Sequence, residues 1–231
     1  MQKTLVSWNV NGIRASEKKG FLNWLYNSQF DVVGIQETKV SDISVLKDEL
    51  KQPTGYHAYW NCSIEKKGYS GVAIFSKEKP KNIITDFGNN LLSKEGRMIQ
   101  AEYDSFTLLN IYFPNGGSGE ERLQYKLKFY QQFLDYIDTL KNRQKNIIFC
   151  GDINTAHKEI DLTRPKENVN TSGFMPVERE WINRFIEHKY IDTFREFHSE
   201  PNQYTWWDQK TRARERNIGW RIDYFFITQN L

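Results

Sequence analysis

The sequence has few cysteines and no long apolar run. Its 231 residues include only Cys62 and Cys150, which lie far apart in the chain, so a disulfide framework is not expected. Cys150 lies inside an apolar run and is expected to pack as a small hydrophobic residue. No stretch approaches the roughly 18 apolar residues of a membrane-spanning helix. The segment Met1–Trp8 enters a strand pattern without the apolar core of an export signal, so we expect an intracellular protein.

The sequence also lacks a strong excess of charge of one sign. It has 32 Lys and Arg against 29 Asp and Glu, a formal net charge of +3. This mildly basic balance is compatible with a nucleic-acid partner but does not demand one. A hydrophobic content of 39%, with 15% aromatic residues, is ample for a packed core. Because no repeat, composition shift or low-complexity tract divides the chain, we expect a single domain over residues 1–231.

Strand-like and helix-like segments alternate along the chain. Runs rich in β-branched and aromatic residues predict nine strands, at Thr4–Trp8, Asp31–Ile35, His57–Trp60, Gly71–Phe75, Met98–Tyr103, Thr107–Tyr112, Asn146–Cys150, Gln203–Trp207 and Arg221–Ile227. Apolar spacings of three and four predict helices over Phe21–Asn27, Glu121–Lys141 and Val177–His188. In the longest helix we expect the Lys-rich face to be in water. Nine strands with few helices favour an α/β fold of two packed sheets over a single doubly wound sheet.

Oxygen-bearing side chains follow three of the predicted strands. They are Asn9 and Asn11, Gln36 and Glu37, and Asp152 and Asn154. Such residues are common in turns, but their recurrence favours one shared function, as does Asp223 inside the apolar run Ile222–Ile227, where an unpaired carboxylate would be costly to bury. If the three strands lie side by side, their ends converge. Clustered carboxylate and amide oxygens, without Cys or paired His, are typical of a site for a hard cation such as Mg²⁺.

Six short motifs follow one another along nearly the whole chain. They are Trp8–Arg14, Gln36–Lys39, Gly68–Val72, Tyr112–Asn115, Cys150–Asn154 and Gly219–Tyr224. In this order they resemble the motif series of the exonuclease III family of apurinic/apyrimidinic endonucleases, within the endonuclease/exonuclease/phosphatase superfamily. Thr155–Leu162 is more similar to the branch that includes the major human enzyme than to the enzyme of enteric bacteria. The resemblance implies an α/β four-layer sandwich, two mixed β-sheets packed face to face with helices outside, and Mg²⁺-dependent hydrolysis of DNA phosphodiesters.

The resemblance also predicts a further strand, preceded by a Ser-Asp-His block whose His is central to catalysis. The sequence reaches Gln229–Leu231 without such a block. We therefore expect the last strand and the catalytic His to be missing and the domain to be C-terminally incomplete. The four histidines do not lie in that motif, and a surface or capping role is expected for each. They are His57, His157, His188 and His198.

By resemblance, Glu37 is the direct metal ligand, with Asn9 and Asn11 nearby. The family sometimes has Asp at the position of Asn11, and an amide ligates a metal without adding negative charge. Mg²⁺ is the expected cofactor, with Mn²⁺ as an alternative. A bound divalent ion can stabilise the charge of the transition state and assist the leaving 3′-oxygen.

The remaining catalytic candidates are Tyr112, Asn115, Asp152, Asn154 and Asp223. Asp152 is expected to orient or deprotonate the attacking water, and Asn154 to share its cavity because alternate side chains share a strand face. The resemblance places Tyr112 and Asn115 at the scissile phosphate. It assigns Asp223 to orienting the missing His.

Aromatic and basic residues form the expected DNA-binding set. Trp206 and Trp220 match family positions that form a small pocket for an extrahelical sugar without a base, whereas Trp207 is more consistent with core packing. For Arg212–Arg216, a solvated charge run and a DNA-facing one are equally consistent with the sequence. Phosphate contacts without sequence readout are expected from the motif loops, specifically from Arg14, Lys18, Lys19, Tyr69, Arg97 and Asn168.

These observations predict a DNA-repair phosphodiesterase that incises the backbone 5′ to an abasic site, with 3′-5′ exonuclease and 3′-phosphatase activities as further expectations. The expected partner is double-stranded DNA with abasic sites, without a membrane, and the protein is expected to be a monomer. In a bacterial source it would be cytoplasmic and nucleoid-associated. Two alternatives stay open: a catalytically silent DNA-binding or partner-binding module, and a small-molecule phosphoesterase of the same superfamily.

Overall fold

The structure, a computed structural model, describes residues 2–86, 88, 94–143 and 146–231. The chain divides into two compact units. Unit 1 comprises Met1–Tyr112 and Ile148–Gly151, and unit 2 comprises Phe113–Ile147 and Asp152–Leu231. Each unit is described separately, and the expectation of a single domain stays a prediction.

The first sheet of unit 1 has the strand order β1-β2-β4-β3 and mixed strand directions. Strand β1 (Leu5–Asn9) runs parallel to β2 (Val32–Gln36). A parallel pair needs a crossover connection, which α1 (Ile13–Lys18) and α2 (Phe21–Ser28) supply. Strand β4 (Val72–Ser76) pairs antiparallel with β2 and with β3 (His57–Asn61).

A second sheet in unit 1 packs face to face with the first. Its strands in unit 1 follow the order β5 (Asn82–Ile84), β6 (Met98–Glu102), β7 (Thr107–Tyr112) and β8 (Ile147–Asp152). Of β8, residues Ile148–Gly151 belong to unit 1. Between the sheets, the Asn110 amide donates to the carbonyls of Ile35 and Ala73, at 3.1 and 2.9 Å. The Gln36 amide donates to Asn110 Oδ1 at 2.6 Å. These buried hydrogen bonds join β7 to the end of β2.

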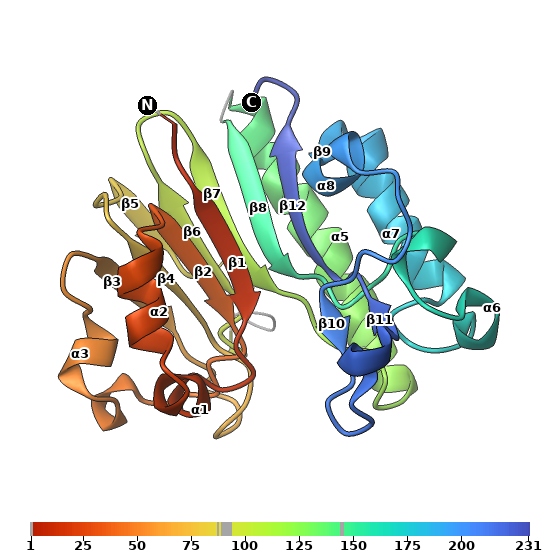
Figure 1. Ribbon diagram of the computed structural model, residues 1–231. Coiled ribbons are helices and arrows are strands. Elements are labelled where there is room, and N and C mark those ends of the chain that lie inside the picture. Colours follow the sequence, from red (N-terminus) through yellow and green to blue (C-terminus); the bar gives the residue numbers. More distant parts are fainter. Residues whose placement is uncertain (1, 87, 89–93, 144–145) are drawn as a thin grey trace. The chain divides into compact units, whose positions relative to one another are not determined.

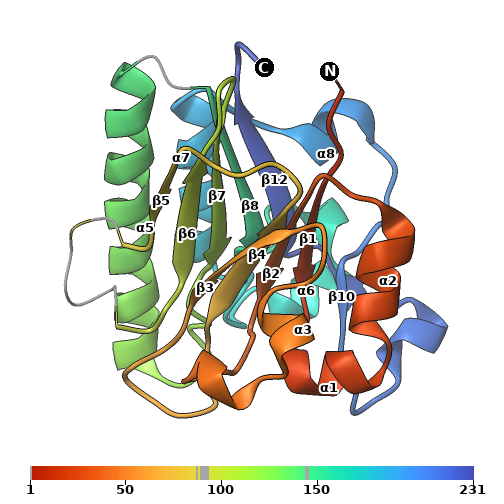
Figure 2. The ribbon, with the colours of Figure 1, turned by 90° about the vertical axis from the view of Figure 1, so that its left-hand side faces the viewer.

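Helices cover the outer face of the first sheet, as Figures 1 and 2 show for α1, α2 and α3 (Asp48–Lys51). A 3-10 turn, η1 (Ile43–Val45), precedes α3. Phe21 and Leu25 of α2 are almost fully buried in one cluster with Ile35 and Phe75 of the sheet. Burial of these side chains on one helix stripe fixes α2 against β2 and β4.

In unit 2, two long helices lie along β12 (Asp223–Thr228), which pairs antiparallel with β9 (Tyr190–Asp192) (Figure 1). They are α5 (Glu120–Asn142) and α7 (Pro176–Glu187). The Phe185 ring of α7 lies 5.7 Å from Phe226 of β12 and 6.1 Å from Phe133 of α5, centroid to centroid. The shorter elements are η2 (Glu159–Asp161), α6 (Pro165–Asn168), α8 (Thr193–Phe197), β10 (Trp206–Trp207), η3 (Ala213–Arg216) and β11 (Gly219–Trp220).

The predicted fold class is confirmed: the protein is an α/β sandwich of two sheets with helices outside. All nine predicted strands have a counterpart. Strands β5, β9 and β11 were not predicted, because two or three residues are too short for a period-2 pattern to be detected. Among the described residues, no helix has the length and apolar character needed to cross a bilayer.

Two points of placement differ from the sequence analysis. The condition that the three strands lie side by side holds for β1 and β2, but β8 lies in the second sheet. Within unit 1 the Cys150 thiol of β8 meets the Ser7 hydroxyl of β1. The Lys-rich face of α5 is not wholly in water, because Lys126 is fully buried. Its ammonium is paired with Glu178, a partner that helix periodicity does not reveal.

A buried charge network holds the start of β12 in unit 2. The Arg221 guanidinium donates to Asp161 Oδ1 at 2.8 Å and to both carboxylate oxygens of Asp192. Arg195 donates to the same Asp161 oxygen. Burial alone would raise the pKa of Asp161, but the hydrogen bonds from Arg221 and Arg195 and the Arg221 charge outweigh it, so this pKa is lowered.

We expect Asp161→Asn to lower the free energy of unfolding by about 3–5 kcal/mol at neutral pH, because it leaves Arg221 partly unpaired in the interior. Since the folded-state pKa of Asp161 lies below its unfolded value, its contribution is present above about pH 4 and disappears as the pH falls through the folded pKa. Urea unfolding of both proteins at several pH values measures this difference. Asp104→Asn, in an exposed pair with Lys81, should cost less than about 1 kcal/mol. An equal loss in the two variants would contradict the prediction.

Candidate active site

The segments that follow β1 and β2 pair with each other and turn sharply. The backbone N–H of Gly12 donates to the carbonyl of Glu37 at 2.7 Å, and that of Val10 to Gln36 at 3.1 Å. Asn11 and Glu37 both have left-handed backbones, with φ values of 47° and 51°. This places their side chains at the same edge of the first sheet.

Glu37 is the centre of what we call the Glu37 cluster: Asn9, Asn11, Glu37, Lys39 and Tyr112. Its Oε1 accepts hydrogen bonds from the Asn9 amide at 2.9 Å and from the Tyr112 hydroxyl at 2.7 Å. Its Oε2 lies 3.1 Å from the Lys39 ammonium. Burial tends to raise the pKa of Glu37, but the two hydrogen bonds and the Lys39 charge prevail and lower it. The carboxylate is therefore held ionised in a fixed orientation.

The donor set of the Glu37 cluster fits a hard cation. Its oxygens are one carboxylate and the Asn9 and Asn11 amides, without sulfur or imidazole. The Lys39 ammonium contacts both Glu37 Oε2 and Asn11 Oδ1. These two oxygens therefore already bind one cationic group. Among the described residues there is no group of three or more His, Cys, Asp and Glu that could hold a metal. Within the Glu37 cluster, the oxygens available to an ion are those of one carboxylate and of neutral groups.

Tyr112, at the end of β7, is supported by a buried arginine. The Arg97 guanidinium donates to the Tyr112 carbonyl at 2.9 Å, lies 4.7 Å from the ring centroid of Tyr112, and donates to the Tyr69 hydroxyl at 2.9 Å. Only 2% of Arg97 is exposed, and its Nε bonds Glu95 at 2.5 Å. Arg97 thus orients Tyr69 and Tyr112 from a buried position. Its contact with a DNA phosphate stays a prediction.

The predicted basic residues Arg14, Lys18 and Lys19 are all exposed, in or just after α1. Arg14 and Lys18 line a cavity of about 570 Å³ together with Lys39 and Lys47. Lys47 also pairs with Glu17 at 2.8 Å. This part of unit 1 therefore presents a mostly cationic concave surface, as the prediction of phosphate contacts requires.

Asp152 and Asn154 lie together in unit 2 through a turn. The Asn154 N–H donates to Asp152 Oδ1 at 2.8 Å, and Asn154 Nδ2 donates to the Phe113 carbonyl at 2.9 Å. Asn154 has a φ of 56° and lies beyond the end of β8. The expectation that the two share a strand face by alternation is thus wrong, since a left-handed turn brings them together. We call Asp152–Asn154 the Asp152 turn.

Gly151 precedes this turn for a steric reason. With a φ of 140°, it approaches the backbone of β7 so closely that a Cβ would lie 1.8 Å from the Ile111 carbonyl oxygen. Only glycine fits there. Packing in unit 1 therefore fixes the glycine of the Gly-Asp pair, and Asp152 follows it as the last residue of β8.

Of the other catalytic candidates, Asn115 joins the Asp152 turn, donating from Nδ2 to Asn154 Oδ1 at 3.3 Å. Asp223 is half-buried and starts β12, so it does not interrupt an apolar strand as predicted. Its backbone N–H donates to the Thr205 hydroxyl at 3.1 Å. The sequence pattern misplaced this strand start by two residues.

Trp206 and Trp220 are directly opposite each other in the β10–β11 ladder. Trp206 is 44% exposed, and half-buried Trp220 packs on a small cluster of Ala156, Leu162, Phe174 and Ile222. The pair thus offers an aromatic surface with an apolar base. Asn168, a predicted DNA contact at the end of α6, uses its side-chain amide to bond the Arg164 carbonyl.

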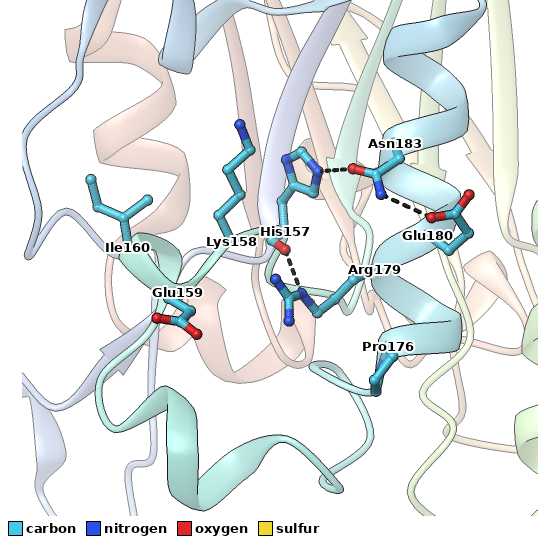
Figure 3. Close-up of a pocket in the computed structure, with 8 residues that line it drawn as sticks. All are labelled: His157, Lys158, Glu159, Ile160, Pro176, Arg179, Glu180 and Asn183. Atoms are coloured by element: carbon cyan, nitrogen blue, oxygen red, sulfur yellow. Dashed lines mark hydrogen bonds between the residues drawn. The ribbon is translucent and has the colours of Figure 1, made fainter.

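A surface or capping role was predicted for His157, but the residue is buried. It is 4% exposed and lines a cavity of about 670 Å³ in unit 2 (Figure 3). Its Nε2 lies 2.7 Å from Asn183 Oδ1, and its carbonyl accepts from Arg179 Nε at 2.7 Å. Burial lowers the pKa of His157, although the hydrogen bond with Asn183 acts in the opposite direction. The lowered pKa favours the neutral ring. A polar neighbour so distant in sequence is not visible in a linear pattern.

Each unit thus brings part of the predicted set together. Unit 1 assembles Asn9, Asn11, Glu37 and Tyr112, and unit 2 assembles Asn115, Asp152 and Asn154. Sequence reasoning missed Lys39, although it was quoted within a motif. The signal available was its position two residues after the carboxylate with which it pairs.

Comparisons with known proteins agree with the motif resemblance. A family model described as the Endonuclease/Exonuclease/phosphatase family matches residues 6–231. The chain is 44% identical over 229 residues to an exodeoxyribonuclease of Bacillus subtilis (strain 168), covering 98% of this chain and 88% of that protein. It is 40% identical over 230 residues to the DNA repair nuclease APEX1 of Danio rerio, covering 98% and 73%.

Among solved structures, an AP endonuclease from Archaeoglobus fulgidus superimposes with a TM-score of 0.89 at 29% identity, over 100% of this chain and 88% of that one. The prediction of an enzyme of the apurinic/apyrimidinic endonuclease type is confirmed by these relatives. The motif order, the sandwich fold and the family match lead to the same conclusion: this chain belongs to the endonuclease/exonuclease/phosphatase family.

Proposed function

We propose that this chain is a Mg²⁺-dependent DNA-repair phosphodiesterase that incises the backbone 5′ to abasic sites and leaves a 3′-hydroxyl. The observation that carries the proposal is the Glu37 cluster, an ionised carboxylate oriented by Asn9 and Tyr112 beside two amide oxygens. The names and similarity of the relatives support DNA repair and nuclease activity. Exonuclease and 3′-phosphatase activities are proposed as side reactions of the same site.

The proposed roles follow from the local chemistry of each unit. Glu37, with Asn9 and Asn11, would hold the divalent ion, which when bound would neutralise charge on the phosphate. Asp152, buried and ionisable, would orient or deprotonate the attacking water. Asn115 and Tyr112 would donate hydrogen bonds to phosphate oxygens, and Asp223 would orient a histidine supplied by a terminal Ser-Asp-His block.

The proposed partner is duplex DNA with abasic sites, bound by a monomer inside the cell. The exposed cations on α1 and the Trp206–Trp220 surface favour DNA over a small phosphoester. A silent binding module remains the second candidate, because the 231 residues contain no Ser-Asp-His sequence. Incision of a duplex carrying a tetrahydrofuran abasic analogue, by this chain and by the same chain extended with that block, separates the candidates.

We expect incision of this duplex to require Mg²⁺ and Glu37→Gln to lower kcat/KM by about 100-fold or more, since the variant lacks the only carboxylate of the Glu37 cluster. The measurement is initial incision rate against Mg²⁺ concentration, with a chelator as blank. Glu78→Gln, which alters a carboxylate paired with Lys3 elsewhere in unit 1, is the matched control and should act like the wild type. Mg²⁺-independent incision would refute the metal role, whereas tight binding without incision by either form would favour the silent module.

Replacing Arg14 or Lys19 with Ala should weaken DNA binding and flatten its salt dependence. Each lost phosphate contact should reduce the slope of log K against log salt by about 1. Fluorescence anisotropy at several salt concentrations measures the slope. Lys81→Ala removes an exposed cation paired with Asp104 and should leave it unchanged. A residue whose removal does not alter the slope is not at the DNA interface.

Trp220→Ala should reduce the preference for an abasic duplex over an intact one by about 10-fold or more, because it removes one wall of the aromatic surface. The ratio of kcat/KM on the two substrates is the readout. Trp207→Phe is the control, since the Trp207 indole is tied to Asn217 and Arg214. An unchanged ratio in the Trp220 variant would exclude it from abasic recognition.

A further inference from the structure

A fully buried ammonium lies behind the Asp152 turn. Lys126 of α5 has 0% side-chain exposure, and its three N–H donors have three acceptors. They are the Asn154 carbonyl at 2.7 Å, Thr155 Oγ1 at 2.8 Å and Glu178 Oε1 at 2.7 Å. Burial lowers the pKa of Lys126, while the Glu178 charge and hydrogen bond and the Asp152 charge act in the opposite direction. The ammonium thus joins α5 and α7 to the segment that carries the catalytic candidates.

The partner carboxylate is as fully satisfied as the ammonium. Besides Lys126, Glu178 accepts from the Ser172 hydroxyl at 2.9 Å and from the N–H groups of Gly173 and Met175, at 2.6 and 3.2 Å. Tyr130 donates to Thr155 Oγ1 at 2.9 Å from the same helix as Lys126. Every polar atom of this buried pair therefore holds a specific backbone or hydroxyl group in place.

The contact with the Asn154 carbonyl is the one that matters for the site. Asn154 has the left-handed φ of 56°, a conformation that neighbouring contacts must maintain. Its N–H bonds Asp152, and its side chain bonds Phe113 and Asn115. The bond from Lys126 is the contact that anchors its carbonyl from the interior. A buried ion pair is often replaceable by apolar residues without loss of stability. A fully hydrogen-bonded pair at this turn therefore points to a role in fixing the backbone conformation of Asn154.

We propose that Lys126 is a positioning residue that, paired with Glu178, fixes the Asp152 turn in the conformation needed for phosphodiester hydrolysis. The inference rests on the proposed function, because it assigns the turn to the reaction. Lys126, a buried residue of α5, is thereby added to the residues that support Asp152.

The test uses the double variant Lys126→Met with Glu178→Gln in the full chain. It removes both charges together, and Gln keeps an oxygen for the Gly173 and Met175 N–H groups. Amide hydrogen exchange followed by NMR is the first measurement. We expect exchange at Asn154 to accelerate about 10-fold or more, while Phe226 in the β12 ladder keeps its wild-type rate. Unchanged exchange at Asn154 would overturn the proposal, whether or not the chain incises DNA.

The second measurement is steady-state incision of the abasic duplex by the form that is active. We expect kcat to fall about 10-fold to 100-fold with KM within about twofold, because the turn is displaced while DNA binding is retained. The control is Phe226→Leu, a core variant of unit 2 away from the turn. An equal fall in kcat in this control, or an unchanged kcat in the double variant, would overturn the proposal. If the wild type does not incise in either form, the proposed function fails, and the exchange experiment still decides whether Lys126 holds the turn.

Discussion

The Glu37 cluster of unit 1 and the Asp152 turn of unit 2 both depend on residues whose backbones are left-handed. Glu37 (φ 51°) directly follows β2, whereas Asn11 (φ 47°) and Asn154 (φ 56°) lie two residues beyond the ends of β1 and β8. This conformation is costly for residues other than glycine, least so for Asn, and most so here for Glu37. It persists because hydrogen bonds to the backbone carbonyls hold it. The Gly12 N–H donates to the Glu37 carbonyl, and the Lys126 ammonium donates to the Asn154 carbonyl. Strain at strand ends thus sets the direction of the functional side chains.

Sequence periodicity was sufficient for the sheet framework, because all the strands it detected except β10 have five or six residues. Periodicity failed where a strand ends in a turn. Asn154 follows Asp152 by two residues, a spacing that suggests one strand face, yet it lies in a turn beyond β8. It also failed for Lys126 and His157, whose polar partners Glu178 and Asn183 are distant in the chain. A linear pattern predicts burial from hydrophobicity, and therefore misses polar groups that are buried with a partner.

Motif identity located the site residues better than it described their surroundings. Glu37, Asn9 and Tyr112, which the resemblance assigned to one site, form one hydrogen-bonded group. Arg97 lies outside the six motifs, is buried, and donates hydrogen bonds to the Tyr112 carbonyl and the Tyr69 hydroxyl. The resemblance named this cation as a DNA contact and did not reveal that it orients two aromatic residues.

The two lysines next to candidate carboxylates compensate charge in different ways. The Lys39 side chain is 37% exposed, and its ammonium contacts Glu37 and Asn11 from the solvent side. Because such a group can return to water at little cost, the proposed metal ion could displace it. The Lys126 side chain is 0% exposed, so its ammonium depends on its buried partners for compensation of its charge. The exposed Lys39 charge therefore lies at the proposed cation site, and the buried Lys126 charge lies at the backbone turn that it is proposed to fix.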